Sequence, residues 1–186
     1  MKHFLLVASA AAALLAACGS MPSGAAAPIA QAAMAQSAPS AVEFVRMAAA
    51  SDQYEIQSSQ LVLQTTQDAD VRRFAEMMVE HHTMTTGTVA RAAEASGITP
   101  PAPVLDAAKA EMIRQLQAAA GPERDDLYKQ QQVMAHREAL LLHGSYAKNG
   151  DETALKAAAA AAAPIVARHY NAIVEMSNHG SPSHAM

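Results

Sequence analysis

The sequence has few of the residues from which sheets, disulfides and nucleic-acid surfaces are built. Its 186 residues include no Trp, one Cys and only 4% aromatics, and 13 Lys and Arg are outnumbered by 17 Asp and Glu. One cysteine excludes a disulfide within the chain and a thiolate metal centre. A formal net charge of −4 provides no basic surface for nucleic acid. The alanine-rich hydrophobic fraction, 51% in all, favours closely packed helices over a β-sheet.

Residues 1–17 are typical of a signal peptide. Lys2 precedes an apolar run over residues 4–17, which is too short for a permanent transmembrane helix. The run ends in Leu-Ala-Ala-Cys at 15–18, which resembles the lipobox of bacterial lipoproteins. The resemblance implies that Cys18 becomes a lipidated N-terminal residue that attaches the protein to a membrane. An ordinary secretory signal with an incidental cysteine is the alternative.

The residues after the cysteine predict a flexible tether over 18–40, because they are mostly Ala, Pro, Ser, Gly and Gln without charge. In lipoproteins of bacteria with two membranes, Gly19 in place of Asp favours the outer membrane. We therefore expect a lipid-anchored protein on the periplasmic side of the cell envelope. Residues 180–186 predict a frayed tail.

Five helical segments are expected between the tether and the tail, forming one domain over 41–179. Ser40 and Glu43 have the spacing of a capping box, Asp68 is a suitable N-cap, and Gly97 is a suitable helix stop. The helices are expected at 40–66, 68–97, 104–119, 122–148 and 151–178. Pro164 is expected to kink the last helix or weaken its hydrogen bonding.

The order of these segments predicts an all-α, ferritin-like, up-down four-helix bundle with a short extra helix in the crossover. The connection between the first two helices is very short, so they should form an antiparallel hairpin. The proline-rich run at 98–103 cannot be helical throughout, and it opens a long connection in the middle of the chain. One long crossover in that place is the ferritin-like arrangement.

Each long helix turns one metal-competent side chain toward the interior. His82, for example, shares a face with Phe74 and Met78 at helical spacing. The candidate metal ligands, one from each helix and all near mid-helix, are Glu55, His82, His136 and His169. Three imidazoles and a carboxylate suit one zinc, copper or iron ion, and do not suit calcium or magnesium.

The alternative for each histidine is a hydrogen-bonded core or boundary residue. His81 points about 100° away from His82 and is a candidate accessory residue flanking the site. His143, two turns from His136, is a second candidate accessory residue or a boundary residue. Met77, Met78, Met84 and Met134 could offer thioethers to copper(I), or belong to the core. Asp52 is either a solvated charge or a partner of a ligand.

The domain resembles the ferritin-like family of exported bacterial proteins known as domain of unknown function 4142. The resemblance covers residues 44–176 and is carried by the order and spacing of short motifs. These are Phe44, Glu55-Ile56, Phe74-Ala75-Glu76-Met77-Met78, His82, His136-Arg137-Glu138, and Leu155 through Pro164 to His169. It implies a helical bundle in which Glu55, His82, His136 and His169 recur as the polar set. His81 and His143 depart from the family pattern.

Ferroxidase chemistry is disfavoured. Di-iron carboxylate proteins place a Glu three residues before each histidine ligand, and those positions here are Val79, Val133 and Val166. The sequence also lacks a glycine-rich phosphate loop and a nucleophile elbow. We therefore expect a metal-binding bundle with no catalytic residues. The alternative is a structural or interaction lipoprotein that docks on an envelope protein and whose inward histidines are only hydrogen-bonded.

Overall fold

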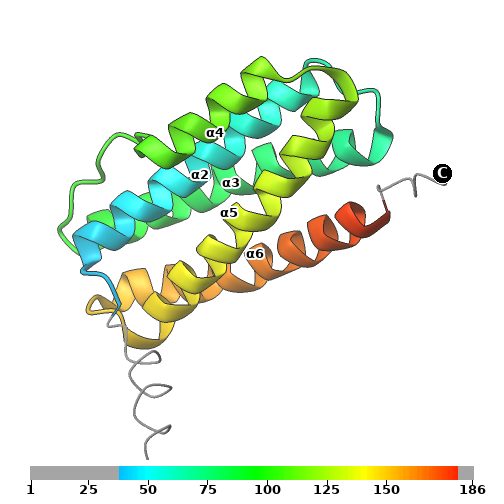
Figure 1. The fold of residues 1–186 in the computed structure, drawn as a ribbon. Coiled ribbons are helices and arrows are strands. Elements are labelled where there is room, and N and C mark those ends of the chain that lie inside the picture. The colour runs from blue at the N-terminus through cyan, green and yellow to red at the C-terminus, as the bar shows by residue number, and fades with distance from the viewer. Residues whose placement is uncertain (1–37, 180–186) are drawn as a thin grey trace, which may run out of the picture. The chain divides into compact units, whose positions relative to one another are not determined.

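The computed structural model of the chain describes residues 38–179 and has five α-helices in that range (Figure 1). The predicted signal peptide, Cys18, most of the tether and the tail at 180–186 lie outside the described residues. The helices are α2 (Ala41–Leu63), α3 (Ala69–Ala95), α4 (Ala107–Ala118), α5 (Gly121–Asn149) and α6 (Thr153–His179). The all-α prediction is therefore confirmed for this part of the chain.

The first long helices begin and end at the residues whose side chains satisfy free backbone groups. Ser40 caps α2, because its Oγ accepts a hydrogen bond from the backbone N–H of Glu43 at 3.4 Å. Asp68 caps α3 by accepting from the N–H groups of the second and third residues of the helix. Beyond α3, Gly97 takes a φ of 72°, which lets the Ile98 N–H reach the Ala93 carbonyl at 2.9 Å.

Four helix ends differ by two or more residues from the sequence prediction. Helix α2 ends at Leu63 rather than near residue 66, and helix α3 ends at Ala95 rather than residue 97. Helix α4 begins at residue 107 rather than 104, because Asp106 caps it by accepting from Lys109 N–H. Helix α6 begins at residue 153 rather than 151, because the Asp151 carboxylate instead accepts from the Tyr146 hydroxyl. The same helix continues without interruption through Pro164.

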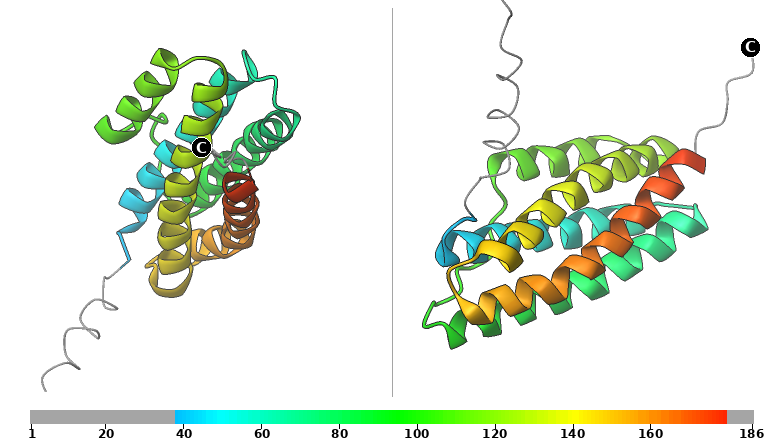
Figure 2. Two further views of the ribbon diagram at one scale, coloured as in Figure 1. Left: turned by 45° about the vertical axis from the view of Figure 1, so that its right-hand side comes forward. Right: turned by 90° about the horizontal axis from the view of Figure 1, so that it is seen from below.

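The four long helices form a ring in which each neighbour runs antiparallel to the next (Figures 1 and 2). Hydrogen bonds between distant segments fix these directions. Tyr54 Oη donates to Gln131 Oε1 at 3.0 Å, and Thr66 Oγ1 donates to Asp125 Oδ2 at 2.8 Å, so α5 runs back along α2. The connection from α3 to α5 therefore travels the length of the bundle, and its helix α4 packs on α2 and α5.

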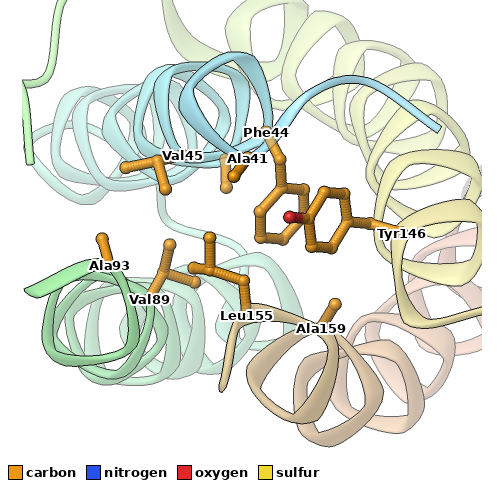
Figure 3. Close-up of a cluster of buried hydrophobic side chains, with 9 residues drawn as sticks. Ala41, Phe44, Val45, Val89, Ala93, Tyr146, Leu155 and Ala159 are labelled. Atoms are coloured by element: carbon orange, nitrogen blue, oxygen red, sulfur yellow. The ribbon is translucent and has the colours of Figure 1, made fainter. Parts of the chain in front are cut away.

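Apolar side chains fill the bundle on both sides of its middle. At the end where α2 begins, Phe44 stacks on Tyr146 with ring centroids 4.0 Å apart, beside Leu155 and Val89 (Figure 3). At the opposite end a second core cluster surrounds Met78. Burying large side chains of this kind stabilises the fold by roughly 1.5–3 kcal/mol each. The polar interior described below lies between these two clusters.

None of the helices in residues 38–179 is both long and apolar enough to cross a membrane.

Candidate metal centre

Three histidines from three different helices meet in the middle of the bundle. His82 on α3, His136 on α5 and His169 on α6 are all buried, with at most 2% of each residue exposed. One ring nitrogen of each lies within 4.8 Å of the others, and the ring centroids are 5.4 to 5.6 Å apart. Among residues 38–179 this is the one group of three or more potential ligands that is close enough to hold an ion.

A buried carboxylate holds the ring of His82. Asp52 on α2 places Oδ1 2.7 Å from His82 Nδ1. The second oxygen, Oδ2, accepts hydrogen bonds from the hydroxyls of Thr85 at 3.0 Å and Thr86 at 2.9 Å. Because the carboxylate can only accept, the Nδ1 atom of His82 carries a proton. The second ring nitrogen, Nε2, then faces the interior.

The other two rings are each held through one nitrogen as well. His136 Nδ1 lies 2.9 Å from the carbonyl oxygen of Gln132, one turn earlier on the same helix. A carbonyl can only accept, so this nitrogen also carries a proton. His169 Nε2 lies 2.8 Å from Nδ1 of His81, and the two rings stack with an interplanar angle of 11°. Each histidine of the triad thus has a partner that orients it.

The remaining nitrogen of each ring has no hydrogen-bond partner. These buried atoms are Nε2 of His82, Nε2 of His136 and Nδ1 of His169. In a neutral imidazole one nitrogen donates and the other holds a lone pair. The anchored nitrogens of His82 and His136 donate hydrogen bonds, and the anchored nitrogen of His169 donates when His81 accepts. In that arrangement the second nitrogen of each ring holds a free lone pair. Histidine ligands of metals are commonly held in this way through their second nitrogen.

Burial and neighbouring charges shift the pKa values of the cluster in opposite directions. Burial lowers the pKa of His136, and burial together with the charges of the neighbouring histidines lowers that of His169 to about 2. Burial also acts to lower the pKa of His82, but the hydrogen bond and charge of Asp52 outweigh it and raise that pKa. Of the three histidines, His82 is therefore the one whose pKa is raised, because its carboxylate lies beside it.

Glu55 lies next to the triad without belonging to the three-residue group. Its Oε1 is 3.6 Å from His136 Nδ1, and both of its carboxylate oxygens are buried without a hydrogen-bond partner. The residue is fully buried. An unpartnered buried carboxylate is costly unless a cation or a proton balances it. This carboxylate is therefore available to a cation bound among the histidines.

The two accessory candidates have different surroundings. His81 is half-buried and contacts the triad directly through His169. His143 is buried outside the three-histidine group, with its ring nearly perpendicular to that of Phe44 at 5.6 Å between centroids. Burial lowers the pKa of His143. His143 therefore lies toward the apolar end of the bundle, while His81 extends the cluster toward the surface.

Of the residues that hold His82, the sequence offered Asp52 with two interpretations, a solvated charge or a partner of a ligand. Asp52 is buried, with 4% exposed, so it is a partner of the candidate ligand His82 rather than a solvated charge. The sequence did not indicate Thr85 or Thr86. One signal for Asp52 was available, because it lies three residues before Glu55 and so on the same face of its helix. Of the methionines, Met78 belongs to the core, whereas Met84 and Met134 are exposed.

Comparison with known proteins identifies the family. Residues 26–176 match the family described as domain of unknown function (DUF4142), so the chain belongs to it. No curated protein and no solved structure matches the chain.

Proposed function

We propose that this DUF4142 chain binds one transition-metal ion inside its bundle, through His82, His136 and His169. One observation carries the proposal: three buried imidazoles, each anchored through one nitrogen and without a hydrogen-bond partner on the other, each bring one ring nitrogen within 4.8 Å of the others. Imidazole ligands suit zinc, copper and iron. Helical bundles commonly hold metals through side chains of facing helices. Together with the single long crossover between α3 and α5, this supports the assignment of the bundle as ferritin-like.

Charge balance makes Glu55 the proposed fourth ligand or counter-charge. Neutral imidazoles contribute no charge, so a divalent ion would bring two positive charges into a buried space. The carboxylates of Glu55 and Asp52 are both buried and would offset those charges. With Glu55 bound, the site is closed and suits storage or a structural role; without it, one coordination position is open.

The alternative is a bundle whose inward histidines are only hydrogen-bonded. It is less well supported, because it gives no reason for three imidazoles from three helices to meet at one place. A buried nitrogen without a partner also occurs at His143, outside the triad, so the convergence of the rings is what favours a metal. Neither candidate includes a catalytic nucleophile or base. We therefore propose sequestration, sensing or structural stabilisation rather than catalysis.

The proposal is tested by the metal content of the full chain, purified without a histidine tag from cells supplied with zinc, copper and iron. We expect near-stoichiometric metal in the native protein and its loss in the double variant His82→Ala/His169→Ala. His143→Ala is the matched control, since it removes a buried histidine outside the triad. Metal should also raise the unfolding free energy by about 2.7 kcal/mol at a hundredfold excess over Kd. Equal metal content in all three proteins, or no metal in any, would reject the site.

We further propose that Cys18 is lipidated and holds the protein at the periplasmic side of the outer membrane. The support is the lipobox-like run at 15–18 behind a short apolar segment. Labelling cells with a fatty-acid probe should mark the native chain and leave Cys18→Ser unmarked. A labelled Cys18→Ser protein, or an unlabelled native protein, would reject the anchor.

A further inference from the structure

The triad is closed to solvent on its own. Each of its three histidines exposes at most 2% of its surface, so an ion cannot reach them directly. His81 differs, because it is half-buried and its Nδ1 lies 2.8 Å from His169 Nε2. Among the imidazoles in contact with the triad, it is the one nearest the surface.

A cleft lies between α3, α5 and α6, and its lining comes within about one helical turn of this histidine. Its volume is about 550 Å³. The lining residues are Asp68, Asp70, Arg73, Phe74, Met77, Lys129, Ala172, Glu175 and Met176. Three carboxylates and two thioethers can bind cations. The two basic side chains each pair with an aspartate, Arg73 with Asp70 and Lys129 with Asp126.

Both walls of the cleft end one helical turn from the histidine pair. On α3, Met77 precedes His81 by four residues, or roughly 6 Å along the axis. On α6, Ala172 follows His169 by three residues, or roughly 4.5 Å. Because α3 and α6 are antiparallel, these two steps lead in the same direction. The hydrogen-bonded pair of His81 and His169 therefore lies about one helical turn beyond the lining of the cleft, in the direction of the triad.

We propose that this cleft is the entry path of the metal ion, and that His81 is the first imidazole to bind it. A partly hydrated late transition-metal cation would meet carboxylates at the mouth and the thioethers of Met77 and Met176 further in. Thioethers bind such ions, copper(I) in particular, more readily than they bind magnesium or calcium. His81 would then pass the ion to the triad as its hydrogen bond to His169 breaks. The inference rests on the proposed function.

A second, smaller cavity on the opposite side of the triad lacks these features. Its volume is about 90 Å³, and it is lined by Met84, two threonines and apolar side chains of α3 and α6. Its lining contains no carboxylate. Its methionine provides a control, since Met84 lies on the same helix as Met77 but on the far side of His81.

The test is the rate at which the metal-free full chain takes up Zn²⁺ and Cu⁺ from a chromophoric chelator, followed by stopped flow. Met77→Trp fills the cleft, and Met84→Trp places the same bulk at the control position. We expect Met77→Trp to slow uptake and release alike, by about tenfold or more, with unchanged Kd and stoichiometry. Met84→Trp should match the native rates. Equal uptake rates in the two variants would overturn the entry path.

His81→Phe separates a relay from a purely orienting role. Phenylalanine can keep the stacking on His169 but offers no ligand atom. A relay predicts a slower uptake rate, whereas a group that only orients His169 would change the release rate alone. A faster release with normal uptake therefore overturns the inference while leaving the metal site in place. Failure of the native protein to bind either ion at equilibrium would reject the proposed function, and the entry path with it.

Discussion

His82 Nδ1 lies 2.7 Å from Asp52 Oδ1, and neither side chain is more than 5% exposed. This pair sets the orientation of one candidate ligand from a different helix. It also places a negative charge directly behind the imidazole, where the charge favours either a proton or a metal ion on the ring.

Replacing that carboxylate by an amide should weaken metal binding. In Asp52→Asn, one oxygen can still accept from His82, but the charge is lost and an amide nitrogen faces the hydroxyls of Thr85 and Thr86. We expect a 10–100-fold loss of Zn²⁺ affinity, of the size found when such partners are removed. Competition with a chelator of known affinity measures it. Asp106→Asn, at an exposed helix cap where Asn serves equally well, should retain native affinity.

Neutralising Glu55 should raise the stability of the metal-free protein and weaken the stabilisation by metal. Glu55→Gln removes a buried charge whose two oxygens lack partners, so the metal-free protein should become more stable, by about 1 kcal/mol. The same change removes a counter-charge to the bound ion, so the increase in Tm on adding Zn²⁺ should shrink. Thermal unfolding with and without metal measures both effects. A less stable metal-free variant with an undiminished metal response would contradict this assignment.

The stability of the metal-free protein should fall as the pH falls below about 6.5. Burial keeps the pKa of His136, His143 and His169 below that of an exposed histidine, so the unfolded chain gains protons that the folded chain does not. Each proton that only the unfolded chain binds lowers the free energy of unfolding by about 1.4 kcal/mol for each pH unit of decrease. His82 acts in the opposite direction, because its pKa is raised and protonation favours its folded form.

Urea unfolding at about pH 7.5 and about pH 5.5 in the presence of a chelator tests the balance of these effects. Three histidines have lowered pKa values and one has a raised value, so the free energy of unfolding should be larger at the higher pH. His169→Gln should flatten the slope, because it removes the most strongly lowered group. A native protein that becomes more stable at the lower pH would show that the His82–Asp52 pair dominates.

Removing one hydroxyl should loosen the end of the bundle without affecting the metal. Tyr146 Oη donates to Asp151 Oδ1 at 2.7 Å, and the other oxygen of Asp151 accepts from the Ala41 N–H at 3.3 Å. Burial and this hydrogen bond raise the pKa of Tyr146 to about 12. Tyr146→Phe can keep the stacking on Phe44 and should cost about 1 kcal/mol. Denaturant unfolding measures this cost, and Zn²⁺ affinity should stay native.

The helices were predictable because their signals are local. Asp68 and Gly97 mark the ends of α3 through their own side chain or backbone, and apolar spacing shows which face is buried. Helix α6 begins later than predicted because Asp151 bonds to Tyr146, five residues earlier, and to Ala41, at the start of the first helix. The contact with Ala41 leaves no trace in the local pattern.

The candidate centre was predictable in part for the same reason. Helical spacing predicts that His82, His136 and His169 lie on the inward faces of their helices. Their mid-helix positions predict similar heights along the axis of the bundle. Spacing could not show that Glu55 lies beside His136 rather than among the three rings, since that depends on side-chain conformations across helices. It also could not show which nitrogen of each ring is anchored, which is what leaves the other three nitrogens free.

The antiparallel ring of helices gives the bundle two unlike ends. The chain enters at Ser40, at the end where α3 finishes and α6 begins, and that end is closed by the stacked rings of Phe44 and Tyr146. The cleft lies at the other end, where α3 begins and α6 finishes. The residues that precede Ser40 therefore join the bundle at its sealed end. The opening through which we propose that ions enter lies at the opposite end of the bundle.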